Sequence, residues 1–121
     1  MIGELSDNIY IVKVNPALFD VEAFKARYLA VVQAAAPGMR VLFDLRQLSV
    51  CDGRVAADVS VFFKNIRHQS LDKVELVVIC VPNAVVQTLV MAFIPTPSPT
   101  EVLTKVFSRS RDAMAALRSP I

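Results

Sequence analysis

An almost continuous apolar run at residues 74–81, V-E-L-V-V-I-C-V, constrains the fold more than any other feature of the chain. Glu75 is its single charged residue, and most of the others are β-branched. Strands of parallel sheets have this composition, because helices cover both of their faces. The run therefore predicts a central strand of a parallel sheet, which requires long crossover connections to its neighbours.

Strands and helices alternate along the rest of the chain. Short apolar or alternating segments predict further strands at residues 8–14, 40–45 and 101–107. Residues 4–5 are expected to form a short lead-in to the first of these strands. Apolar residues at helical spacing predict a helix after each strand, with N-cap residues at Asp20, at Asp52, at Asn83, and at Ser108 or Ser110. The alternation predicts an α/β fold over residues 1–121: a single domain with a mostly parallel four- to five-stranded sheet, about four helices and right-handed crossovers.

The chain is more apolar than an average domain. Hydrophobic residues make up 55 per cent of it and charged residues 20 per cent, against about 45–50 and about 25 per cent in typical domains. A chain this small has too little interior to bury all of its apolar side chains. The excess therefore predicts an exposed apolar patch that a second copy covers, most simply in a homodimer.

Charge, cysteine content and hydropathy exclude several classes of protein. The net charge is only +2 with scattered basic residues, so no nucleic-acid partner is expected. Cys51 and Cys80 lie in or beside apolar runs and are expected as buried thiols, while His68 is the one histidine and is expected at an exposed helix end, so neither metal nor cofactor is predicted. No apolar run approaches the ~20 residues of a membrane span. We expect a soluble cytoplasmic protein that does not contact a membrane.

The sequence at residues 41–57, V-L-F-D-L-R-Q-L-S-V-C-D-G-R-V-A-A, resembles the centre of STAS domains, the fold of bacterial anti-sigma factor antagonists. Those domains have a strand ending in aspartate–leucine, followed by an Asp-Ser-Ser/Thr-Gly turn that opens a helix. Asp44 and Leu45 match the strand, and Asp52 matches the turn aspartate. The resemblance implies a STAS-like fold and a role in protein binding.

The chain departs from the family at the residues that carry its switch. The two hydroxyl positions fall on Gly53 and Arg54, and the glycine falls on Val55. In the family the second hydroxyl accepts a phosphate from a partner kinase. The resemblance therefore implies a variant without the phospho-switch, and Ser49, just before the turn, is interpreted as a turn hydroxyl.

No arrangement of residues predicts catalysis. Asp44 is expected in a strand and Asp52 as a helix cap, so they are not interpreted as an acid–base pair. The sequence favours a non-catalytic, regulatory protein-interaction domain, for which the resemblance suggests a regulatory kinase or sigma-pathway protein as partner. The alternative is a binder of a small anionic or lipid-like ligand at the helix start formed by Asp52, Gly53 and Arg54.

The predicted partner surface lies where strands end and helices begin. Parallel strands present their carboxyl ends at one edge of the sheet, which is where α/β folds place binding groups. Asp52, Gly53, Arg54 and Asn83 are expected on this edge. Arg54 is the strongest candidate, because a guanidinium near a helix N-terminus is electrostatically unfavourable and attracts an anionic partner. The alternative is that Arg54 is simply solvated.

Overall fold

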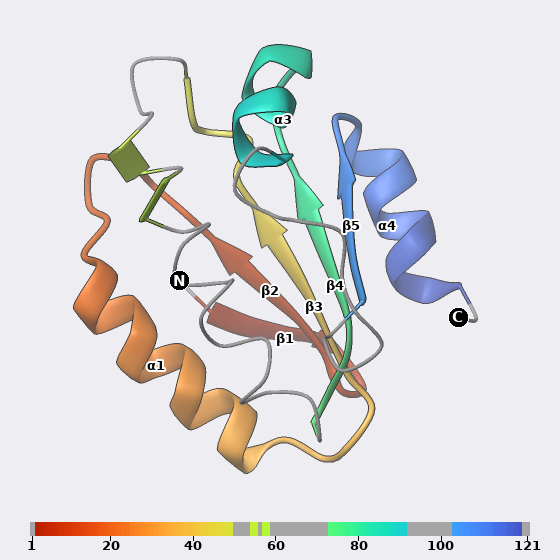
Figure 1. The fold of residues 1–121 in the computed structure, drawn as a ribbon. Helices are drawn as coiled ribbons and strands as arrows, with labels where there is room; N and C mark the ends of the chain where they lie inside the picture. The colour runs from red at the N-terminus through yellow and green to blue at the C-terminus, as the bar shows by residue number, and fades with distance from the viewer. Residues whose placement is uncertain (1, 50–53, 56, 59–72, 92–102, 120–121) are drawn as a thin grey trace.

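The computed structural model describes residues 2–49, 54–55, 57–58, 73–91 and 103–119 (Figure 1). A five-stranded sheet runs through this part of the chain in the order β1-β2-β3-β4-β5. Its strands are β1 Ile2–Ser6, β2 Ile9–Lys13, β3 Met39–Asp44, β4 Val74–Cys80 and β5 Leu103–Phe107. The helices are α1 Val21–Ala34, α3 Ala84–Met91 and α4 Ser110–Arg118.

All strand pairs except the first are parallel. β2 pairs with β3, β3 with β4, and β4 with β5 in parallel, whereas β1 pairs with β2 antiparallel. The predicted α/β class and mostly parallel sheet are confirmed, and the chain forms a single small domain. β5 is an edge strand of this sheet.

The N-terminal hairpin is longer than the sequence predicts. Where a lead-in over residues 4–5 is expected, β1 forms a full strand that is mostly exposed. Asn8 closes the turn to β2 with φ 57°, a left-handed conformation that asparagine tolerates better than most residues. Because β1 contributes little to the core, its sequence lacks the apolar alternation by which strands are recognised.

β4 is the buried strand that the apolar run predicts. It lies between β3 and β5, and every residue in it except Glu75 is buried. Met39 pairs with Val74 but Arg40 pairs with Leu76, so Glu75 is an extra residue at a register shift. A bulge of this kind lets a strand place a charged side chain outside the layer.

Two apolar cores cover the two faces of the sheet. Neighbouring residues of β3 and β4 alternate between them, as the twofold period of a strand requires. The first core joins the sheet to α1 and α3 through Phe24, Tyr28, Val32, Phe43, Ile79, Val86 and Val90, among others. The second joins it to α4 through Leu42, Leu76, Val78, Cys80, Ala113 and Leu117. Figure 1 shows α1 and α4 on opposite sides of the sheet.

The predicted start of α1 is confirmed. The Asp20 carboxylate accepts hydrogen bonds from the backbone amides of Glu22 and Ala23 at 3.0 and 3.3 Å. These amides have no partner within the helix, so the cap stabilises it by about 1 kcal/mol. Gly38, with φ 88°, lies in the turn that leads from α1 to β3.

The predicted cap of the last helix is wrong. Ser110 is the first helical residue, and the N-cap is Arg109, which makes no capping hydrogen bond with its side chain. Ala113 and Leu117 are fully buried against the sheet. Their packing and the short connection from β5 fix where α4 begins, so neither Ser108 nor Ser110 serves as a cap.

The helix predicted to follow Asp52 is described only in part. Arg54, Val55, Ala57 and Asp58 are helical, and Val55 packs against the first core. Asp52, Gly53 and residues 59–66 lie outside the described part of the chain, as do Cys51 and His68.

Candidate functional site

The carboxyl ends of the parallel strands form one edge of the sheet, as the sequence predicts. Lys13 at the end of β2 pairs in register with Asp44 of β3, which pairs with Cys80 of β4. Cys80 in turn pairs with Phe107 at the end of β5. We call the ends of these strands and the segments that follow them the carboxyl edge.

Asp44 and Arg46 form a closed ion pair at the carboxyl edge. Asp44 is only 9 per cent exposed. Arg46 donates to its two carboxylate oxygens from Nε and Nη2, both at 2.9 Å, and its backbone amide donates to Oδ1 at 3.1 Å. A bidentate guanidinium–carboxylate pair fixes geometry as well as charge. The pair therefore holds the turn after β3 in place.

Electrostatics at this pair favour the charged carboxylate. Burial alone would raise the pKa of Asp44, but the hydrogen bonds and charge of Arg46, with the charge of Lys13, outweigh it and lower the pKa below its usual value. The pKa of Arg46 is raised, mainly by its hydrogen bond to Asp44. Both groups thus remain charged near neutral pH.

The neighbouring thiol of Cys80 is not activated. Burial raises its pKa, and the opposing effect of Arg46 is smaller. A nucleophilic cysteine needs the thiolate form, which a lowered pKa provides. Cys80 is therefore a buried apolar side chain of the second core, as the sequence predicts.

The described members of the predicted partner surface are Arg54 and Asn83. Arg54 is exposed and helical, so its side chain is accessible. Asn83 caps α3: its Oδ1 accepts the backbone amide of Val86 at 3.0 Å. Asn83 is exposed and directly follows the end of β4, which places it on the carboxyl edge. Asp52 and Gly53 lie outside the described residues.

Two large apolar side chains are exposed on the carboxyl edge, and neither is among the residues predicted for the partner surface. Leu18 is 82 per cent exposed in the turn between β2 and α1, and Val85 is 62 per cent exposed in the first turn of α3. Both lie outside the periodic stripes that face the core. The sequence signal for such an exposed residue is an apolar side chain that fits the periodic pattern of neither neighbouring element.

A pocket of about 580 Å³ lies beside the start of α1. We call it the α1 pocket. Its apolar lining includes Ile2, Leu18, Phe19 and Phe24, and two cationic residues, Lys13 and Arg27, also line it. It lies partly on the carboxyl edge, because Lys13 ends β2.

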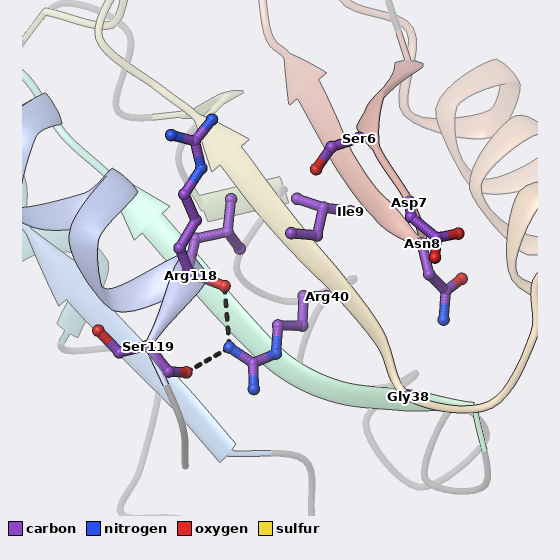
Figure 2. Close-up of a pocket in the computed structure, with 9 residues that line it drawn as sticks. Ser6, Asp7, Asn8, Ile9, Gly38, Arg40, Arg118 and Ser119 are labelled. Atoms are coloured by element: carbon purple, nitrogen blue, oxygen red, sulfur yellow. Dashed lines mark hydrogen bonds between the residues drawn. The ribbon is translucent and has the colours of Figure 1, made fainter.

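A second pocket, of about 490 Å³, lies at the opposite, amino edge of the sheet (Figure 2). The hairpin turn at Asp7 and Asn8, the start of β3 at Arg40 and the end of α4 at Ser119 line it. Its principal cation is already engaged, as Figure 2 shows by two hydrogen bonds from Arg40 to the end of α4.

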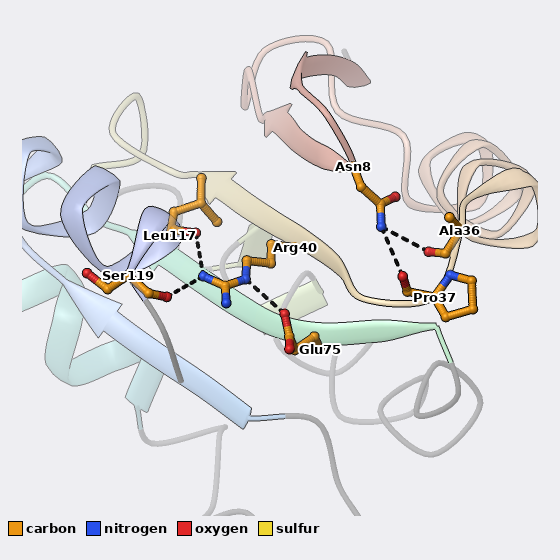
Figure 3. A network of polar contacts seen from close by, with 7 residues as sticks. All are labelled: Asn8, Ala36, Pro37, Arg40, Glu75, Leu117 and Ser119. Atoms are coloured by element: carbon orange, nitrogen blue, oxygen red, sulfur yellow. Dashed lines mark hydrogen bonds and ion pairs between the residues drawn. The ribbon is translucent and has the colours of Figure 1, made fainter.

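Arg40 joins α4 to the sheet through the network in Figure 3. Its Nη1 donates to the backbone carbonyls of Leu117, at 2.9 Å, and Ser119, while its Nε donates to Oε2 of Glu75 at 2.9 Å. Carbonyls at the end of a helix lack partners within it, so a cation that binds them caps the helix. The network therefore holds the end of α4 against the sheet, and we call a contact of this kind a joint.

Asn8 forms a comparable joint at the hairpin turn (Figure 3). Its Nδ2 donates to the carbonyls of Ala36 at 3.1 Å and Pro37 at 3.3 Å, just after α1. Together with Arg40, it secures the amino edge by contacts within the chain. The carboxyl edge, with its exposed apolar and cationic side chains, is the better candidate for a functional surface.

The described residues contain no group of three or more His, Cys, Asp or Glu side chains that could hold a metal ion. Within the same residues, no helix has the length and apolar character needed to cross a membrane.

Comparison of the chain with known proteins gave no match to a family model, to a curated protein or to a solved structure. The resemblance to STAS domains therefore rests on residues 41–57 and on the order of elements that follows them.

Proposed function

We propose that the chain is a non-catalytic protein-interaction domain whose partner binds the carboxyl edge of the sheet. The observation that carries this proposal is the exposure of Leu18 and Val85 on that edge, where Arg46 and Arg54 are exposed as well. The Arg46 side chain is 51 per cent exposed even though it pairs with Asp44. Arginine is enriched in protein interfaces, and apolar side chains gain free energy when a partner covers them.

The chemistry of the described side chains supports binding over catalysis. The Asp44 carboxylate is held by Arg46, and the Cys80 thiol is kept protonated by burial. Neither group is poised to exchange a proton or attack a substrate near neutral pH. Asp44 and Arg46 serve instead as an ion pair, and Asn83 serves as a helix cap.

The STAS resemblance adds a class of partner to this proposal. A STAS-like domain of the anti-sigma factor antagonist type would bind a regulatory kinase or a sigma-pathway protein in the cytoplasm. Gly53 and Arg54 stand where the family has its hydroxyls, so binding would not be switched by phosphorylation.

Site-specific photo-crosslinking in the native cell tests where the partner binds. A benzophenone side chain at Leu18 or at Val85 should capture a protein of one defined mass. The matched control is Gln33, exposed near the other end of α1 towards the amino edge. Equal capture from Gln33, or none from the carboxyl edge, would contradict the proposal.

The substitution Arg54→Glu tests the charge of the surface once that partner is purified. Affinity should fall by a factor of about ten or more, equivalent to about 1.4 kcal/mol, because an anionic partner would meet a like charge. Since Arg54 is exposed, the free energy of unfolding should change by no more than about 0.5 kcal/mol. Arg111→Glu, at an exposed position on α4, is the control and should keep full affinity.

Phosphate mapping tests the loss of the switch. Incubation with an anti-sigma-type kinase and ATP should leave residues 49–60 unmodified, as read by mass spectrometry. Stoichiometric phosphate on Ser49 or Ser60 would refute a constitutive binding domain.

A further inference from the structure

The α1 pocket has the size and lining of a small-molecule site. Its volume of about 580 Å³ falls within the range of about 300–1,000 Å³ that is usual for ligand sites. Such sites combine a largely apolar lining with a few polar groups that fix orientation. The α1 pocket has both, and Arg54 is not among its described lining residues.

The apolar part of the pocket is built around two aromatic rings. Phe19 and Phe24 have ring centroids 5.5 Å apart, and Phe24 is buried in the first core. Leu18 lines the same pocket and is 82 per cent exposed. A ligand with an aliphatic chain would cover Leu18 and contact the rings, and so remove apolar surface from water.

Two of the three charged residues in the described lining of the pocket, Lys13 and Arg27, are cationic. Arg27 is exposed on α1 and makes no ion pair with any other residue in the part of the chain that the structure describes. Lys13 also lines the pocket, and its positive charge acts on Asp44 as well. The one carboxylate in the lining, Asp20, already accepts two backbone amides as the cap of α1.

The Asp20 cap also affects which anionic head group the pocket can bind, because it occupies backbone amides at the helix start. Phosphate sites at helix starts rely on free backbone amides, but those of Glu22 and Ala23 are bound to Asp20. A guanidinium fork binds carboxylates and phosphates alike, but a phosphate has more oxygens to satisfy, and the amides that usually supply the further donors are occupied. The donors that remain therefore suit a carboxylate better than a phosphate.

From this geometry we propose that the α1 pocket binds an aliphatic carboxylate, with its chain against Leu18, Phe19 and Phe24 and its head group on Arg27 and Lys13. This inference goes beyond the proposed function. Both use the exposed Leu18, but Val85 and Arg54 are not among the described lining residues of the pocket. Loss of partner binding on Arg54→Glu should therefore leave decanoate binding unchanged.

Titration with octanoate and decanoate, below their micelle-forming concentrations, tests the apolar half of the site. Amide chemical shifts in a ¹⁵N-labelled sample should change in residues 13–27. Affinity should rise about fourfold with each methylene, equivalent to about 0.8 kcal/mol. No saturable shift, or affinity that does not change with chain length, would overturn the proposal.

Decanol and decyl phosphate test the head group. Decanol should bind at least about fivefold more weakly than decanoate, because a charge-assisted hydrogen bond is lost. Decyl phosphate should bind no more tightly than decanoate. Equal binding of decanol would refute the role of the cations, and tighter binding of decyl phosphate would refute the preference for a carboxylate.

Paired variants on α1 locate the site. Arg27→Gln should weaken decanoate binding about fivefold, whereas Lys25→Gln should not, because Lys25 pairs with Glu22 and does not line the pocket. Ala23→Met should block binding by filling the pocket, and Ala30→Met, at an exposed site on the same helix, should not. Equal effects within either pair would place the binding elsewhere.

Discussion

At the scale of the residue, Asp44 is the most strongly constrained charged group that the structure describes. Its carboxylate is almost buried yet ionised, because Arg46 supplies three hydrogen bonds. The signal for this pair was present in the sequence: an aspartate at a turn accepts the backbone amide two residues further on, here that of Arg46. The resemblance to STAS domains covers Asp44 but assigns no role to Arg46, so it does not predict the pair.

Replacing Asp44 with asparagine should make stability less dependent on pH. The folded-state pKa of Asp44 is lowered, so its contribution is present above the unfolded-state pKa and is lost as pH falls through the folded-state pKa. Asp44→Asn should lower the free energy of unfolding by about 1.5 kcal/mol at pH 7, since a hydrogen-bonded charge is lost. Urea denaturation should show this difference shrinking towards pH 3.

Glu22→Gln is the control for that measurement. Glu22 pairs with Lys25 at 3.5 Å on the surface, with its side chain 79 per cent exposed. Surface pairs of this kind contribute about 0–1 kcal/mol. A difference for Asp44→Asn that stays constant between pH 3 and pH 7 would contradict the ionised pair.

At the scale of the element, the sequence was most informative where burial is greatest. The run at residues 74–81 predicted β4, and the spacing after Asp20 predicted α1, because packing against a core imposes a regular apolar pattern. β1 was largely missed because it is mostly exposed and lacks a regular apolar alternation. The joint between Arg40 and Leu117 could not be predicted, since no local pattern links residues that far apart in the chain.

Amide hydrogen exchange should rank β4 among the most protected segments. Its residues pair on both sides, with β3 and with β5, and nearly all are buried. Exchange there then requires global unfolding. β1, which has a partner on one side only, should exchange faster; slow exchange in β1 with fast exchange in β4 would contradict this arrangement.

Replacing Arg40 should loosen α4. Arg40→Met removes the donor to two carbonyls at the end of α4 and leaves Glu75 without its partner. The free energy of unfolding should fall by about 2–3 kcal/mol, and amides of α4 should lose protection before those of β3.

Arg118→Met is the matched control for Arg40→Met. Arg118 is exposed in the last turn of α4, where its charge contributes at most about 1 kcal/mol. Equal destabilisation by the two substitutions, measured by urea denaturation, would show that the joint through Arg40 adds nothing specific.

At the scale of the whole molecule, the two faces of the sheet are covered unequally. α4 lies over β3, β4 and β5. On the same face of the hairpin, Ile9 and Ile11 are only partly buried and Leu5 is 41 per cent exposed. Part of the excess of apolar residues in the chain therefore lies on this face of the β1–β2 hairpin.

We expect this side of the sheet to form the interface of a homodimer. Multi-angle light scattering at micromolar concentration should give the mass of two chains, because a second copy would bury Leu5 and Ile11. Leu5→Asp should shift the equilibrium to monomer, whereas Leu18→Asp, on the carboxyl edge, should leave it unchanged. A monomeric mass at every concentration would refute the dimer.

Because α4 follows all five strands in the chain, it can dock onto Arg40 only after the sheet has been synthesised. The strands that carry Leu42, Leu76 and Val78 leave the ribosome before residues 110–119, which supply the cover for that face. Until then the nascent sheet can bury one face only, against α1 and α3, while the other remains open to water. Chaperones that bind exposed apolar strands can act on the sheet during this interval, which ends when α4 docks onto Arg40.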